Sequence, residues 1–214
     1  MIVERRMTQN PVTIQQDMPV AEAQRLMRQE KIHRLPVLNM HNELVGIVTE
    51  KDLLYASPSP ASSLDVYEMH YLLSKLTVKK VMSKPVISIT SNTAIEEAAR
   101  IMVDKNIGGL SVVDDGRLVG IITESDIFKV FIELFGARQR GIRVSMLVSE
   151  EPGELAKLAK VIFDHNGDII SFGTFLGTCP SNAFCVMKVT GIPEDMLIEI
   201  LTPLVQEFKD VREV

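Results

Sequence analysis

Residues typical of secreted, membrane-spanning or nucleic-acid-binding proteins are scarce in this sequence. The only two cysteines, Cys179 and Cys185, are too few for a disulfide framework, so we expect reduced thiols in a cytoplasmic protein. No apolar run approaches the roughly 20 residues of a membrane span, and the first residues lack the apolar stretch of a secretory signal. A formal net charge of -5 argues against a nucleic-acid partner, which would require a basic face.

Signals of catalysis are also missing. The four histidines are scattered without a metal-binding spacing such as His-x-x-x-His, so no metal cofactor is expected. There is no Gly-x-Ser-x-Gly nucleophile motif, and Cys185 lies in an apolar run that is typical of a core. The sequence therefore predicts a protein that is not an enzyme and has no catalytic residues.

What the sequence does contain is an internal repeat. The segment Gly46-Ile-Val-Thr-Glu-Lys-Asp52 returns as Gly120-Ile-Ile-Thr-Glu-Ser-Asp126, 74 residues later. Upstream of it, residues such as Met27 match residues 75 positions later, such as Met102. Self-similarity at this scale indicates two copies of one supersecondary unit, and each copy carries one Thr/Asp pair.

Each copy is predicted to fold as strand, helix, strand, strand and helix, from its hydrophobic periodicity and turn residues. In the first copy these are a strand at 11–14, a helix at 20–30 that buries Val20, Ala23, Met27 and Leu26, strands at 35–38 and 44–48, and a helix after Thr49. In the second copy, Asp115-Gly116 predicts a tight hairpin turn between strands at 110–113 and 118–122, and the last helix follows Thr123.

A proline- and serine-rich linker at 57–63 separates the two copies. It leads into a predicted helix at 64–76, for which Ser62 and Asp65 are spaced as a capping box. We expect this helix to pack on the repeats or on a second subunit.

From residue 142 onward the pattern predicts a different domain, with the ferredoxin-like order βαββαβ. The elements are a strand at 142–148, a helix, strands at 169–176 and 183–190, a helix from about Glu194 and a last strand ending at Val214. The apolar face predicted for the first helix consists of Leu155, Leu158, Ala159, Ile162 and Phe163. Pro203 should end or kink the second helix, and 136–141 is the predicted domain boundary.

Two interpretations of the Thr/Asp pairs are open. Thr-x-x-Asp suits a helix start, because the hydroxyl accepts from the backbone N–H three residues on and the carboxylate favours the helix dipole. Alternatively, the helix N-terminus and the hydroxyl bind a phosphate, and the carboxylate accepts both hydroxyls of a ribose. The glycine three residues before each threonine favours the second interpretation, because glycine inside a strand is expected where something approaches closely.

With these features, residues 7–54 and 82–131 resemble tandem CBS domains, which pair as a Bateman module. Gly-h-x-Thr-x-x-Asp, where h is hydrophobic, is that family's adenosine-nucleotide motif, and both copies are intact. The resemblance implies that Thr49 and Thr123 contact phosphate and that Asp52 and Asp126 hold ribose. It also implies adenine contacts at the first strand and before the second strand of each copy, namely Thr13, Ile14, Ile32 and Pro36 in the first copy and Ser88, Ile89, Ile107 and Ser111 in the second.

His33 and Arg34 in the first copy resemble the residues that reach the phosphates in nucleotide-sensing CBS proteins. A guanidinium suits a phosphate because it makes two parallel charge-assisted bonds. The alternative is that Lys31, His33 and Arg34 are solvated cations that favour a helix C-terminus. The second copy has Gly108 and Gly109 at the corresponding places, so equal occupancy of the two sites is not expected: they should differ in affinity or in phosphate number.

The turn Glu151-Pro152-Gly153-Glu154-Leu155 resembles the strand-to-helix turn of ACT domains, which bind amino acids or other small metabolites. The resemblance implies a ligand near Pro152 and Gly153. One alternative is that Pro152 is simply the first helical residue and Gly153 a close-approach position. Another is that the ACT fold serves only for dimerisation.

The predicted architecture is a mixed α/β (α+β) fold with a tandem CBS pair at 1–135 and a ferredoxin-like ACT domain at 142–214. Within the pair, repeat 1 covers about 7–56, the linker and its helix 57–78, and repeat 2 about 79–132. This order is similar to that of the AcuB-like acetoin-utilisation regulatory proteins.

The leading hypothesis is a cytoplasmic regulatory homodimer. Its CBS pair binds an adenosine nucleotide (AMP, ADP or ATP), although S-adenosyl compounds present the same groups, and binding alters the interaction with an unidentified partner protein. The rival hypothesis is a purely structural dimerisation module without a small-molecule ligand, in which each Thr/Asp pair is only a helix cap.

Overall fold

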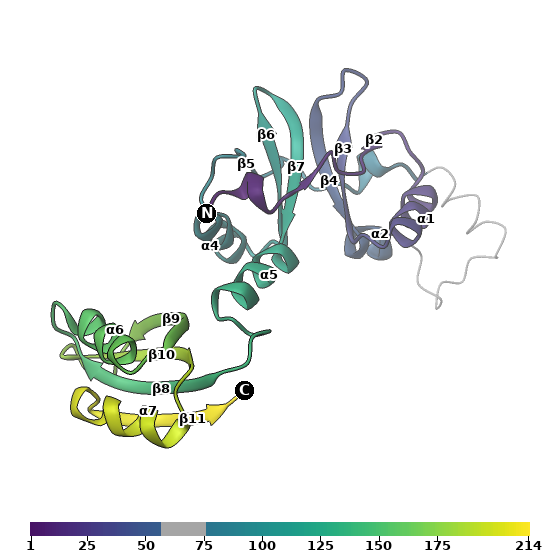
Figure 1. Cartoon of the computed structure of the whole chain (residues 1–214). Coiled ribbons are helices and arrows are strands. Elements are labelled where there is room, and N and C mark those ends of the chain that lie inside the picture. The colour runs from purple at the N-terminus through teal and green to yellow at the C-terminus, as the bar shows by residue number, and fades with distance from the viewer. Residues whose placement is uncertain (57–75) are drawn as a thin grey trace. The chain divides into compact units, whose positions relative to one another are not determined.

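The computed structural model describes residues 1–56 and 76–214, which form two compact units (Figure 1). The first unit comprises Met1–Ile127 and the second Phe128–Val214. The linker predicted at 57–63 and the helix predicted at 64–76 lie outside the described residues, apart from Leu76. In the described part of the chain, no helix combines the length and the hydrophobicity of a membrane span.

The first repeat has the predicted order of elements. These are β2 (Ile14–Gln15), α1 (Val20–Glu30), β3 (Arg34–Leu38), β4 (Leu44–Thr49) and α2 (Glu50–Tyr55). β2 pairs with β3 in parallel and β3 with β4 antiparallel, which gives a three-stranded sheet. α1 buries Val20, Ala23 and Met27 as its periodicity predicts, and Leu26 is half-buried. The first strand begins only at Ile14, after Pro11, which has no N–H to donate to a ladder.

The second repeat has the same order. Its elements are β5 (Ser88–Ile89), α4 (Ile95–Lys105), β6 (Gly109–Asp114), β7 (Arg117–Thr123) and α5 (Glu124–Leu134). The hairpin between β6 and β7 is the predicted two-residue turn, since Asp115 (φ 48°) and Gly116 (φ 75°) both have positive φ. α5 spans the division between the two units.

Each repeat is completed by a segment that precedes the other repeat in the sequence. The N-terminal residues form η1 (Val3–Arg5) and β1 (Thr8–Gln9), and β1 pairs antiparallel with β7 of the second repeat. The residues before the second repeat form η2 (Val78–Lys80), and Val78 is buried in the core of the first repeat. Each folded repeat therefore includes a short segment that lies, in the sequence, before the other repeat.

The exchanged segments explain the glycine that precedes each Thr/Asp pair. A Cβ on Gly46 would overlap Met82 Sδ and lie 2.8 Å from Met82 Cγ, and a Cβ on Gly120 would overlap Met7 Sδ. The sequence favours a ligand as the close neighbour of these glycines, but the neighbour is a methionine side chain. The two glycines therefore give no support to ligand binding.

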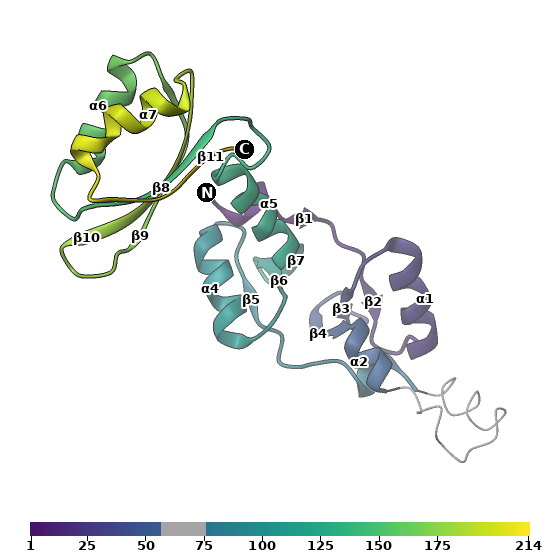
Figure 2. The same ribbon diagram turned by 90° about the horizontal axis from the view of Figure 1, so that it is seen from below.

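The second unit contains the predicted βαββαβ order. After α5, the elements are β8 (Ile142–Ser149), α6 (Glu154–Asp164), β9 (Asp168–Leu176), β10 (Asn182–Thr190), α7 (Glu194–Leu201), η3 (Thr202–Leu204) and β11 (Glu207–Glu213). The four strands form an antiparallel sheet in the order β11-β8-β10-β9. α6 and α7 cover one face of this sheet (Figure 2) and bury Leu158, Ile162, Leu197 and Leu201 against it. α7 ends before Pro203, as predicted.

The apolar face predicted for α6 is only partly correct. Leu158 and Ile162 are buried, but Leu155 is 51% and Phe163 77% exposed, and Ala159 is exposed as well. At 3.6 residues per turn, Ala159 and Phe163 lie more than a quarter turn around the helix from Leu158. The face of α6 that contacts the sheet is narrower than the set of apolar residues on the helix. Its third buried residue is Glu154.

Candidate functional site

In the first repeat, Thr49 and Asp52 form a closed hydrogen-bonded pair at the start of α2. Thr49 Oγ1 accepts from the Asp52 backbone N–H (3.2 Å). Asp52 Oδ2 accepts from the Thr49 backbone N–H (2.8 Å) and from the Thr49 hydroxyl (2.7 Å). This reciprocal arrangement is a capping box, and it fixes the positions of both side chains.

The second repeat shows the same geometry. Asp126 Oδ2 accepts from the Thr123 backbone N–H (3.1 Å) and from the Thr123 hydroxyl (2.8 Å), and Asp126 is buried. The helix starts are also bonded in the same way to the residues just before β3 and β6. Glu50 N–H donates to the carbonyl at residue 33 (3.0 Å), and Glu124 N–H to the carbonyl at residue 108 (3.2 Å). The two pairs therefore occupy equivalent places.

These bonds determine which atoms a ligand could use. A threonine hydroxyl has one proton, and both threonines donate it to an aspartate Oδ2. A phosphate oxygen could accept from either hydroxyl only after that hydroxyl rotates away from the carboxylate. At Asp52 both capping bonds to the carboxylate go to Oδ2, so Oδ1 is the oxygen that a ribose hydroxyl would approach.

The other residues expected at the site lie on neighbouring strands of the same sheets. Arg34 lies opposite Thr49 in the β3–β4 ladder, and Gly109 opposite Thr123 in the β6–β7 ladder. In the parallel ladders, residue 14 lies opposite residue 37, which places Thr13 near Pro36, and residue 88 lies opposite residue 111. Four of these residues are buried, Ile14, Pro36, Ile89 and Ser111, and Ile32 and Ile107 are half-buried. The side chains of Ile14 and Ile89 face the core, so only their backbone could meet a molecule bound at these strands.

His33 and Arg34 have different surroundings. His33 Nδ1 lies 2.9 Å from Glu50 Oε2, and this histidine stays beside the helix start of its own repeat with its side chain 77% exposed. Arg34 is half-buried. Of the three cations of the alternative interpretation, His33 and Lys31 are exposed and only Arg34 is half-buried, and Lys31 forms the left-handed cap of α1.

Arg34 reaches the second repeat. A Cβ on Gly109 would overlap Arg34 Nη1. A Cβ on Gly108 would lie 2.7 Å from Arg34 Nη2 and 2.8 Å from Glu124 Oε2, so guanidinium and carboxylate share one side of this glycine. Burial lowers the pKa of Arg34, and the charge of Glu124 opposes this shift. The two glycines of the second repeat thus leave the space that this side chain fills.

Ser111 is a further unusual residue of the second repeat. It is completely buried, and its Oγ has no hydrogen-bond partner among the described residues. The corresponding residue of the first repeat is Pro36, which has no hydroxyl. An unpaired buried hydroxyl costs about 1–3 kcal/mol, so this oxygen is a group that a bound molecule could satisfy.

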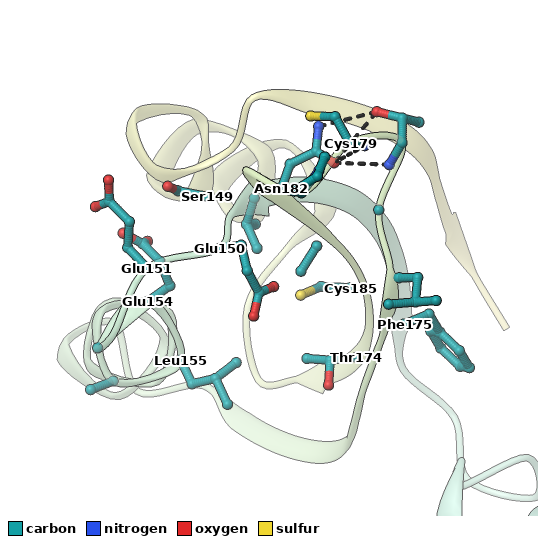
Figure 3. Close-up of a pocket in the computed structure, with 18 residues that line it drawn as sticks. Ser149, Glu150, Glu151, Glu154, Leu155, Thr174, Phe175, Cys179, Asn182 and Cys185 are labelled. Atoms are coloured by element: carbon teal, nitrogen blue, oxygen red, sulfur yellow. Dashed lines mark hydrogen bonds between the residues drawn. The ribbon is translucent and has the colours of Figure 1, made fainter.

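The second unit has a hollow of about 1240 Å³ between the β8–α6 turn and the β9–β10 hairpin (Figure 3). Glu150 and Cys185 lie close together in it. Burial, and to a smaller extent the Glu150 carboxylate, raises the pKa of the Cys185 thiol to about 11. Of the two residues expected to contact an ACT ligand, Gly153 lines the hollow, whereas Pro152 is not among the described lining residues.

The structural roles expected for Pro152 and Gly153 are wrong. α6 begins at Glu154, so Pro152 is not its first residue. Gly153 precedes the helix with φ 96°, and a Cβ there would meet no atom within 4 Å. The glycine is therefore required by its left-handed backbone and not by a close approach.

The loop opposite Gly153 was missed by sequence reasoning. Asn182 Oδ1 accepts from the backbone N–H groups of Thr178 (2.9 Å) and Cys179 (3.2 Å), as Figure 3 shows. Cys179 is exposed, and hydrogen bonds from Ser181 lower the pKa of its thiol. The cluster of turn-forming residues from 177 to 182 is the signal that could have revealed this wall of the hollow. Across the described residues, no group of three or more His, Cys, Asp or Glu side chains is arranged to hold a metal ion.

The CBS domain family model matches residues 3–59 and 78–133, more than half of the chain, so the chain belongs to the CBS domain family. The tandem CBS pair expected from the sequence is thereby confirmed. CBS pairs commonly bind adenosine ligands in regulatory roles, and CBS domain proteins are generally not catalytic.

Among curated proteins, a CBS domain-containing protein of Dictyostelium discoideum is 32% identical over 134 residues, 62% of this chain and 92% of that protein. An uncharacterized protein of Methanopyrus kandleri is 35% identical over 105 residues, 49% of each chain. The inosine-5'-monophosphate dehydrogenase of Korarchaeum cryptofilum is 30% identical over 172 residues, but these are 75% of this chain and 33% of the enzyme. The chain thus spans half or less of several curated relatives.

The solved structures similar to this chain include the following three. An acetoin utilization protein (AcuB) of Vibrio cholerae has a TM-score of 0.53 at 31% identity, over 64% of this chain and 95% of that one. The CBS domain pair of protein MJ0100, in complex with 5'-methylthioadenosine and S-adenosyl-L-methionine, has a TM-score of 0.52 at 28% identity, over 65% and 98%. CBSX2 in complex with AMP has a TM-score of 0.51 at 28% identity, over 64% and 98%.

Proposed function

We propose that this chain is a non-catalytic regulatory protein. Its CBS pair binds an adenosine-containing nucleotide, and nucleotide binding changes the interaction with a partner protein. The observation that carries the proposal is the recurrence of one Thr/Asp geometry at equivalent helix starts in both repeats. Two similar structures contain AMP or S-adenosyl-L-methionine, which supports an adenosine ligand here. AMP, ADP and ATP are the candidate ligands.

In this proposal the two halves of each site have different roles. Thr49 and Thr123 bind phosphate, and Asp52 and Asp126 accept the ribose hydroxyls. The adenine contacts are Thr13, Ile14, Ile32 and Pro36 in the first repeat and Ser88, Ile89, Ile107 and Ser111 in the second. Nucleotide binding would have to exchange the Thr–Asp hydrogen bond for bonds to the ligand. Such an exchange would couple occupancy to the starts of α2 and α5.

A second candidate function is a dimerisation module without a ligand. The observation in its favour is that the hydroxyl of each threonine and the Oδ2 atom of each aspartate are already bonded to one another. Helix capping alone would then explain both motifs. The two candidates differ in whether nucleotides stabilise the protein.

We further propose that the second unit is an ACT-like domain. Its βαββαβ order and sheet order support this, and the hollow beside Gly153 is where an amino acid or another small metabolite would bind. The proposed assembly is a homodimer. The similarity to the acetoin utilization protein makes that pathway a candidate for the regulated process.

Thermal unfolding with AMP, ADP, ATP, S-adenosylmethionine and the common amino acids tests these proposals. A ligand at 100 times its dissociation constant stabilises the folded state by about 2.7 kcal/mol. An adenosine ligand should raise the midpoint, and Asp52→Asn together with Asp126→Asn should remove the effect. Asp195→Asn, at an exposed aspartate of the second unit, is the matched control. A midpoint that no adenosine compound shifts would favour the ligand-free module.

A further inference from the structure

The two candidate nucleotide sites differ in the charge that surrounds them. Arg34 and Gly109 occupy corresponding positions of the two repeats, yet the Arg34 side chain lies against Gly108 and Gly109. The guanidinium of Arg34, a residue of the first repeat, therefore lies in the second repeat. The second repeat contributes no corresponding cation to the first, because Gly109 has no side chain.

The position of Arg34 is close to the proposed phosphate group of the second site. Gly109 lies opposite Thr123 in the β6–β7 ladder, and Glu124 is the residue directly after Thr123. Glu124 Oε2 and Arg34 Nη2 both lie within 2.8 Å of the place where a Gly108 Cβ would be. The half-buried guanidinium of Arg34 lies beside the Glu124 carboxylate, where it could donate hydrogen bonds to an anion at the start of α5.

The second site also has a hydroxyl that the first lacks. Ser111 Oγ is fully buried and unpartnered among the described residues, and Pro36 stands at the corresponding position. On β3, Arg34 and Pro36 alternate with the core residues Leu35 and Val37, and Gly109 and Ser111 alternate likewise on β6. The second candidate site therefore has two polar groups without a counterpart in the first, the guanidinium of Arg34 and the hydroxyl of Ser111.

We propose that Arg34 of the first repeat is the phosphate-binding cation of the second repeat's site. The site of Thr123 and Asp126 then selects phosphorylated adenosine ligands, and the site of Thr49 and Asp52 discriminates less between a nucleotide and its nucleoside. This inference rests on the proposed nucleotide-binding function and assigns a ligand class to each of its two sites.

Calorimetric titration of the full chain with AMP and with adenosine tests the assignment. Asp52→Asn isolates the second site, and Asp126→Asn isolates the first. A hydrogen bond to a charged group is worth about 1.5–3 kcal/mol, or roughly a 10- to 100-fold change in affinity. In the Asp52→Asn background, Arg34→Ala should weaken AMP by that factor and adenosine by less than about threefold. In the Asp126→Asn background, Arg34→Ala should change neither the affinity for AMP nor the affinity for adenosine.

Two further variants keep the test independent of folding. Gly109→Ala retains the charge but places a Cβ on Arg34 Nη1, so it should reproduce the loss of AMP affinity at the second site. Arg25→Ala removes an exposed arginine of α1 and is the matched control, which should leave both affinities unchanged. Circular dichroism and thermal unfolding establish that each variant is folded.

The outcomes separate this inference from the proposed function. If Arg34→Ala weakens AMP at the first site, or has no effect at the second, Arg34 is not the cation of the second site and the inference is overturned. If the unmodified protein binds neither AMP nor adenosine, the proposed nucleotide function fails, and the inference fails with it.

Discussion

Alanine at Gly46 should destabilise the first unit through its contact with an exchanged segment. The new Cβ would overlap Met82 Sδ and lie 2.8 Å from Cγ and 3.2 Å from Cβ of the same side chain. The backbone next to Met82 is held by two hydrogen bonds, Ser83 N–H to Ile47 (2.8 Å) and Ile47 N–H to Ser83 (3.1 Å), so the contact can be relieved only by rotating the Met82 side chain out of its packed position. Overpacking of this kind costs about 1–3 kcal/mol.

Urea denaturation followed by circular dichroism measures this cost. The control is the same substitution in a Met82→Ala background, where the methionine is absent and Gly46→Ala should cost less than about 0.5 kcal/mol. An equal loss of stability in both backgrounds would refute the reasoning, because it would mean that Met82 is not the neighbour that requires glycine.

Three further changes have expected outcomes. Thr49→Ala removes the cap of α2 and should lower the free energy of unfolding by about 0.5–2 kcal/mol; an unchanged urea midpoint would contradict the capping role. Lys188→Met removes two hydrogen bonds from Nζ, each 2.9 Å long, to the carbonyls of Gly136 and Gln139. It should cost about 1–3 kcal/mol in denaturation followed by circular dichroism; a neutral result would mean that water replaces them. Because the pKa of Cys185 is raised from 9.0 to about 11, the unfolded thiol ionises first and stability should fall as pH rises through that window. Cys185→Ala should flatten this part of the stability–pH profile; identical profiles would refute the shift.

The sequence predicted those features that depend on neighbouring residues. The predicted helix at 20–30 has the observed bounds of α1, because its apolar spacing is a local property. The starts of α2 and α5 follow Thr49 and Thr123 as expected, since a capping pair acts within one turn. The positive φ of Asp115 and Gly116 was likewise predictable from the residue types at a two-residue turn.

Features that depend on distant residues could not be predicted in this way. The reason for glycine at position 46 is Met82, and the reason for glycine at position 109 is Arg34 of the other repeat. Neither neighbour is encoded near the residue that it constrains. The exposure of Phe163 follows from the width of the contact between α6 and the sheet, which an apolar pattern does not define.

Calorimetric titration with AMP tests the central claim most directly, in the unmodified protein and in the Asp52→Asn/Asp126→Asn double variant. The account predicts saturable binding of AMP to the unmodified chain and its loss in a double variant that remains folded. Undiminished binding by the double variant would show that the Thr/Asp pairs do not hold the ligand. No binding by the unmodified chain would leave helix capping as the only role of these pairs.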